Sequence, residues 1–185
     1  MAPETLKELR LPNSPESASR ARAAVHAWLG EAHPAYEPVR LAVSELVTNA
    51  VRHGRHGVSA QGADEHGSEP LVLRVSECDD GDRVRVEVTD RGLTAGTPRV
   101  RPDTVALLAE SIPADPAFLL AEGGRGLAIV DMLSRGRWGF HPNADGLGRT
   151  VWCEIAPEHL EAPRPPGAPY PPAEQSISAV TSSDI

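Results

Sequence analysis

Residues 44–54 read SELVTNAVRHG and lie within a helix that we expect over residues 38–53, with Gly54 at its end. At about 100° per residue, four apolar side chains of this helix form one stripe facing a core: Val43, Leu46, Val47 and Ala50. Four polar side chains cluster on another side: Glu45, Asn49, Arg52 and His53. That polar side is either a solvated helix face or the floor of a site.

Glu45 and Asn49 are the pair on this side with chemical potential. They are four residues apart, so their side chains are neighbours on the helix surface. A carboxylate beside an amide oxygen suits Mg²⁺, a hard cation that takes oxygen ligands. The carboxylate of Glu45 is equally suited to act as a general base.

Composition narrows the class of protein. A chain of 185 residues with 40% apolar and 4% aromatic residues favours one domain whose core is built from Val, Leu, Ile and Ala. The net charge of -8 argues against general nucleic-acid binding. No membrane span or hydrophobic signal segment is visible, and the two cysteines have neither metal nor disulfide spacing. We therefore expect a cytoplasmic protein with no nucleic-acid or membrane partner.

The order of expected elements defines the fold class. A strand at 5–11 and a helix at 15–30 precede the 38–53 helix, and a hairpin of strands 71–77 and 83–89 follows it. A helix then opens from the Gly-rich stretch 123–126, and a last hairpin joins residues 137–141 to 148–155. This order predicts an α+β fold, a two-layer sandwich with a mixed, mainly antiparallel sheet and helices on one face.

Two segments are set apart from these elements. Residues 93–122 form a connection so long that a functional lid is the natural interpretation. Residues 157–185 are rich in proline and lack apolar periodicity, so we expect a disordered tail after a folded domain at 1–156.

Asp90 stands at an unusual place for a carboxylate. It has the same parity as Val84, Val86 and Val88, so it aims at the apolar face if the strand continues that far. A carboxylate there needs a hydrogen-bond donor, and the amino group of a base is one. The alternative is that the strand has already ended and Asp90 and Gly92 belong to a plain turn.

The Gly-rich stretch before the third helix has features of a phosphate site. Gly124 and Gly126 let backbone N–H groups approach a phosphate, and Arg125 between them can add a bidentate contact. The alternative is a flexible hinge. Thr150, at the start of the last strand, is either a ligand contact or an ordinary strand residue.

Four stretches share one order and spacing: LAVSELVTNAVRHG, VEVTDRG, GGRGLAIVDMLS and GRTVWCEI. Together they resemble the GHKL, or histidine-kinase-like, ATPase superfamily. Within it they look most like the short anti-sigma-factor branch, which contains serine/threonine kinases of the partner-switching type. The resemblance covers about residues 5–156 and implies the Bergerat-type ATP-binding fold.

The resemblance implies a role for each motif residue on the helix and the strand. Glu45 would be the general base, and Asn49 would coordinate the Mg²⁺ that bridges the phosphates of ATP. Asp90 would bind the adenine amino group, and Gly92 would let the chain turn beneath the base.

The resemblance also implies roles for the later motifs. Gly124, Arg125 and Gly126 would surround the phosphates, and residues 93–122 would be the ATP lid. Thr150 would touch the adenine end of the pocket.

The implied function is that of an ATP-binding anti-sigma regulatory factor. It would be a serine/threonine protein kinase that phosphorylates an anti-anti-sigma (STAS-type) partner and sequesters a sigma factor. A homodimer formed through the first strand and first helix is also implied.

Two other functions stay open from the sequence. In the first, ATP is a switching ligand of a protein-binding module without efficient kinase activity. Thr94, where the family often has a second glycine, and Glu122, before the Gly-rich turn, leave room for it. In the second, the chain is the catalytic piece of a histidine kinase. This ranks last, because residues 1–37 are too few for a phospho-accepting helical pair plus a strand.

Overall fold

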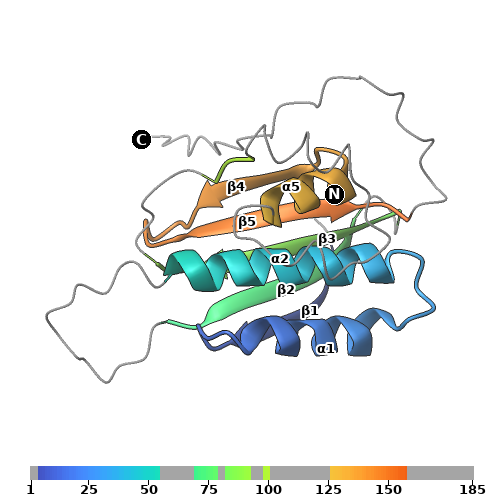
Figure 1. Cartoon of the computed structure of the whole chain (residues 1–185), viewed down its shortest axis with the longest axis horizontal. Helices are drawn as coiled ribbons and strands as arrows, with labels where there is room; N and C mark the ends of the chain where they lie inside the picture. The colour runs from blue at the N-terminus through green and yellow to red at the C-terminus, as the bar shows by residue number, and fades with distance from the viewer. Residues whose placement is uncertain (1–3, 55–68, 79–81, 93–97, 101–125, 158–185) are drawn as a thin grey trace, which may run out of the picture.

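The computed structural model of the protein describes residues 4–54, 69–78, 82–92, 98–100 and 126–157. Its five strands are β1 (Glu4–Leu11), β2 (Leu71–Cys78), β3 (Arg83–Asp90), β4 (Trp138–Pro142) and β5 (Arg149–Ile155). They form one sheet in the order β1-β2-β3-β5-β4, and all four pairings are antiparallel (Figure 1). The central position of β3 places the end of this strand next to the start of β5.

In the described part of the chain, three helices cover one face of this sheet. They are α1 (Ser17–Leu29), α2 (Tyr36–Gly54) and α5 (Gly126–Ser134). Figure 1 shows α1, α2 and α5 in front of the strands, with α2 crossing the middle of the sheet between the other two. The expected α+β fold, two layers with helices on one face, is confirmed.

The core lies between α2 and the inner face of the sheet. The predicted apolar stripe of α2 is buried there, with Val43, Leu46, Val47 and Ala50 each at most 8% exposed. Opposite it, alternate residues of β3 are buried because successive strand side chains point to opposite faces. In α1, Ala21 and Val25 are fully buried and Trp28 packs against the same cluster.

The boundaries of α2 and β3 differ slightly from the expected ones. α2 begins at Tyr36, two residues before the expected Pro38, because a proline in the first helical turn needs no intrahelical N–H bond. β3 continues to Asp90, so the alternative of an earlier turn at this residue is wrong. The turn after α1 occurs at Gly30, whose φ of 73° suits a glycine and whose N–H is bonded to the His26 carbonyl.

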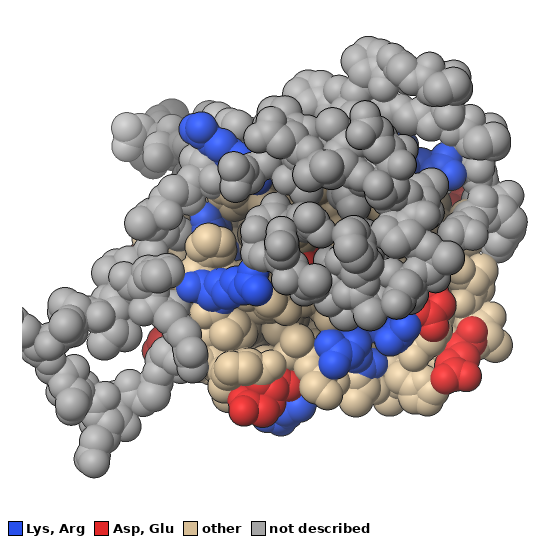
Figure 2. Space-filling view, in the orientation of Figure 1, with Lys and Arg blue, Asp and Glu red and all other residues tan. Residues whose placement is uncertain are grey.

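Charged side chains of both signs are exposed beside the helices. Figure 2 shows basic and acidic groups close together in the described part of this face. One pair of this kind is Arg40 with Glu37 on α2, at 2.6 Å. Among the described residues, no helix has the length and apolarity that crossing a membrane requires.

Several expected segments lie outside the described residues. These are the turn at 79–81 between β2 and β3, the tail after residue 157, and all of the expected lid 93–122 except residues 98–100. Val100 packs against the hydrophobic core.

Leu73 in β2 provides a test of the core. It is fully buried, so Leu73→Ala is expected to lower the free energy of unfolding by about 2–5 kcal/mol, measured by chemical denaturation. Leu147 is 53% exposed and serves as the matched control, with an expected change within about 0.5 kcal/mol for Leu147→Ala. Equal losses in the two variants would show that β2 does not face the core.

Candidate functional site

The polar side of α2 is half-buried rather than solvated. Glu45 and Asn49 are both intermediate in exposure, whereas Arg52 and His53 in the last turn are exposed. Burial raises the pKa of the Glu45 carboxyl, and the positive charge of Arg52 acts in the opposite direction. Desolvation therefore dominates at Glu45, as expected for a carboxylate in a site rather than on a wet helix face.

The start of α5 explains why this side of α2 is half-buried. Gly126 is the first residue of α5, and it lies directly against Glu45 and Asn49. A Cβ atom added to Gly126 would stand 2.7 Å from Glu45 Oε2 and 2.9 Å from Asn49 Nδ2. Only a glycine leaves those two side chains where they are, so two motifs 77 residues apart (126 − 49) meet at one point.

Asp90 lies in the sheet with its side chain on the helix side, as its parity predicts. It is 4% exposed, and its Oδ1 accepts a hydrogen bond of 3.1 Å from the backbone N–H of Gly92. Burial raises the pKa of its carboxyl, while Arg149, the Gly92 N–H and His53 act in the opposite direction. His53 is in the last turn of α2, the helix that packs against β3.

The turn between β4 and β5 holds the backbone around Asp90. Asn143 donates from Nδ2 to the Asp90 carbonyl at 2.9 Å and to the Leu147 carbonyl at 2.6 Å. Gly148 has φ of 77°, and a Cβ on it would stand 2.0 Å from the Asp90 carbonyl oxygen. Sequence reasoning missed Asn143 and Gly148, because only the pairing of β3 with β5 brings them to Asp90.

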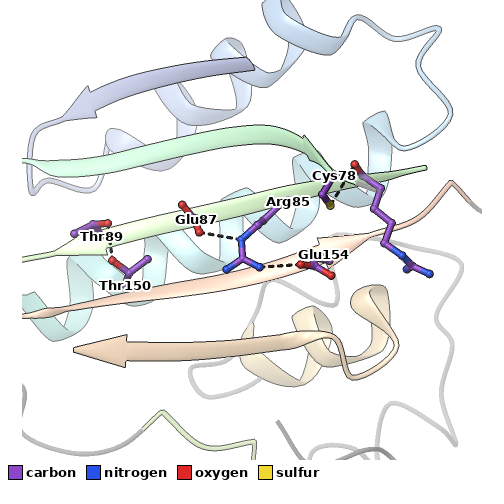
Figure 3. Close-up of polar contacts among 7 residues, drawn as sticks. Cys78, Arg85, Glu87, Thr89, Thr150 and Glu154 are labelled. Atoms are coloured by element: carbon purple, nitrogen blue, oxygen red, sulfur yellow. Dashed lines mark hydrogen bonds and ion pairs between the residues drawn. The ribbon is translucent and has the colours of Figure 1, made fainter. Parts of the chain in front are cut away.

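Thr150 requires a correction. It pairs with Thr89, so it lies on the face of the sheet opposite Asp90, while Arg149 pairs with Asp90. Its hydroxyl is 2.8 Å from that of Thr89 (Figure 3) and donates to Asn143 Oδ1 at 3.1 Å. The strand parity thus places Arg149, not Thr150, beside the buried carboxylate.

The same outer face carries a network of ion pairs on β3 and β5. Arg85 contacts Glu87 at 2.9 Å and Glu154 at 2.8 Å (Figure 3), and its guanidinium lies 4.2 Å from the centre of the Trp152 ring. Arg85 thus bonds one oxygen of each carboxylate, and its bond to Glu154 links β3 to β5 on the face opposite Asp90.

The structure describes only some of the other expected site residues. Gly124 and Arg125 lie outside the described residues, whereas Gly92 is described and bonded to Asp90. Within the described ranges, no three His, Cys, Asp or Glu side chains gather as a metal site. Asn49 beside Glu45 fits a Mg²⁺ that takes most of its oxygen ligands from phosphates and water, as this cation commonly does.

Comparison with known proteins gives a matching family and a relative. The family described as "Histidine kinase-like ATPase domain" matches residues 11–137. A relative named serine-protein kinase RsbW, from Oceanobacillus iheyensis, is 28% identical over 129 residues, which span 68% of this chain and 73% of that protein. These two matches agree with the branch that the sequence motifs resemble.

A solved structure supports the fold alone. The crystal structure of the SiaB-SiaC complex from Pseudomonas aeruginosa matches with a TM-score of 0.50 at 18% identity, covering 82% of this chain and 91% of that one.

The raised pKa of Glu45 has a consequence for stability. Because folding raises this pKa, the carboxyl contributes most to stability while it is protonated, and the contribution is lost as pH rises through the folded pKa. Glu45→Gln is therefore expected to gain stability relative to the parent as pH rises above the usual glutamate pKa of about 4.3, measured by denaturant unfolding. Glu37→Gln, which alters a 67% exposed side chain of the same helix, is the control. The same pH-dependent gain in both variants would contradict a desolvated Glu45.

Proposed function

Because the chain belongs to the family of histidine kinase-like ATPase domains, we propose that it binds Mg-ATP between the polar side of α2, the start of α5 and the end of β3. The observation that carries this proposal is the contact of Gly126 with both Glu45 and Asn49. It joins a carboxylate, an amide and a helix N-terminus in one place, which is what a phosphate–Mg²⁺ group requires.

The proposed division of labour follows from the environment of each side chain. Asp90, buried and held by the Gly92 N–H, accepts a hydrogen bond from the amino group of adenine. Asn49 would supply an oxygen to Mg²⁺. The first N–H groups of α5, which have no partner within the helix itself, would face the phosphates. Gly124 and Arg125 surround the same phosphates, and residues 93–122 close over them as the lid. Bound Mg-ATP would supply the phosphoryl group, and its Mg²⁺ would supply the positive charge that neutralises the phosphates.

Glu45 is the proposed general base. Its raised pKa makes the carboxylate a better proton acceptor than an exposed glutamate, the direction in which enzymes tune such groups. In the proposed reaction it takes the proton of a partner's serine or threonine hydroxyl, whose oxygen then attacks the γ-phosphorus as the bond to ADP breaks.

The biological role we propose is that of a cytoplasmic anti-sigma regulatory factor. Similarity to a serine-protein kinase over 129 residues supports a protein substrate. In the proposed role this chain phosphorylates an anti-anti-sigma partner of the STAS type, sequesters a sigma factor and acts as a homodimer.

Binding of Mg-ATP is the first test. Titration calorimetry is expected to show binding by the parent and a loss of about tenfold or more in Asn49→Ala and Gly126→Ala, because each disturbs the same polar contact. Gly30→Ala is the control, because Gly30 directly follows α1 with a φ of 73°. This variant is expected to lose stability while keeping its affinity for Mg-ATP. A folded parent that binds no ATP at millimolar concentration would overturn the proposed function.

Phosphotransfer separates the kinase from a binding module. Glu45→Gln removes the base but keeps the shape of the side chain, so phosphorylation of a STAS-type partner is expected to fall by about 10²–10⁴-fold while ATP affinity changes little. The measurement is transfer of labelled γ-phosphate under single-turnover conditions. An unchanged rate, or a Glu45→Gln variant that regulates in cells as the parent does, would favour the switching module instead.

A further inference from the structure

The ion pair between Asp90 and Arg149 is a feature that the family motifs leave unexplained. Arg149 is the first residue of β5 and pairs in register with Asp90, the last residue of β3. The side chain of Arg149 is 11% exposed and that of Asp90 is 6% exposed. Arg149 Nε lies 3.6 Å from Asp90 Oδ2. The other oxygen, Oδ1, accepts the Gly92 N–H. Each carboxylate oxygen therefore has its own partner within the protein.

The protonation state of Asp90 decides what this carboxylate can recognise. An ionised carboxylate only accepts hydrogen bonds, whereas a neutral carboxyl also donates one and can face a carbonyl as well as an amino group. Burial favours the neutral form by raising the pKa of Asp90, and Arg149, the Gly92 N–H and His53 oppose it. Among these, Arg149 is the group with a permanent positive charge, and its largely covered side chain lies beside the carboxylate.

The position of Arg149 is held by the backbone around it. Gly148, directly before it, packs on the Asp90 backbone so closely that a Cβ would not fit. Asn143 is hydrogen-bonded to the Asp90 carbonyl, and its Oδ1 accepts from Thr150, directly after Arg149. The distance between the two charged side chains is thus set by three contacts that do not involve them.

We propose that Arg149 is a positioning residue that determines base specificity: its guanidinium keeps Asp90 an acceptor-only group, so the site selects a base with an exocyclic amino group over one with a carbonyl at that place. This inference rests on the proposed nucleotide site and extends it. Adenine carries the amino group at position 6, and hypoxanthine carries a carbonyl there. Arg149 acts through Asp90 and does not contact the transferred phosphoryl group.

The test compares the affinities of Mg-ATP and Mg-ITP, two nucleotides that differ at position 6 of the base. The parent is expected to prefer ATP by about tenfold or more, the size of one hydrogen bond to a charged group. In Arg149→Met the ratio of the two affinities is expected to fall at least about fivefold, through weaker binding of ATP. Arg149→Lys keeps the positive charge and is expected to retain most of the preference.

Arg74→Met is the matched control for loss of an arginine ion pair in the same sheet. Arg74 contacts Glu8 of β1 at 2.8 Å. It pairs with Glu87 of β3, so its side chain lies on the face of the sheet opposite Asp90, and the preference for ATP is expected to stay at the parent's value. A general loss of stability would change both affinities together, and only a role at the base changes their ratio.

The outcomes distinguish this inference from the proposed function. A parent that binds neither nucleotide overturns the proposed function itself. If the parent prefers ATP and Arg149→Met prefers it by the same factor, the proposed role of Arg149 is overturned and the proposed function is not. Loss of the preference in Arg149→Lys as large as in Arg149→Met overturns the explanation by charge. If Arg149→Met does not fold, Arg149→Gln, also neutral, takes its place with the same expectation.

Discussion

The close approach of α5 to the polar side of α2 is the constraint on which the site depends. At Gly126 the space between the two helices does not admit one additional carbon atom without displacing Glu45 or Asn49. This contact leaves both polar side chains half-buried, and it directs the start of α5 at them. Burial raises the pKa of Glu45, against the positive charge of Arg52, so the proposed base lies where its surroundings favour the protonated form.

The ion pairs on the two faces of the sheet differ in distance and in burial. On the outer face, Arg85 lies at hydrogen-bonding distance from both Glu87 and Glu154. On the helix side, Asp90 is buried with a looser ion pair, 3.6 Å from Arg149. Burial raises the pKa of Asp90 although Arg149 and the Gly92 N–H oppose it, so keeping this carboxylate ionised in the folded protein costs free energy.

Local patterns were sufficient to predict the elements and the faces on which several candidate site residues lie. The apolar stripe of α2 and the alternation of β3 each depend on residues close in sequence, so periodicity placed Leu46 in the core and Asp90 on the helix side. The family resemblance assigned Glu45, Asn49 and Gly126 to one site. Asn143, Gly148 and Arg149 were not found, because nothing in PNADGLGR indicates which strand end the turn will meet.

By itself, the sequence determined the order of strands and helices, the sides of α2 and the parity of Asp90, since each follows from the repeat of a helix or a strand. Only the tertiary structure decided that Gly126 contacts α2, that Arg149 rather than Thr150 lies beside Asp90, and that the β4–β5 turn holds the end of β3. Those outcomes depend on the pairing register of β3 with β5, and a shift of one residue would exchange Arg149 for Thr150. Register is set by the packing of the whole sheet against its helices, which no local pattern contains.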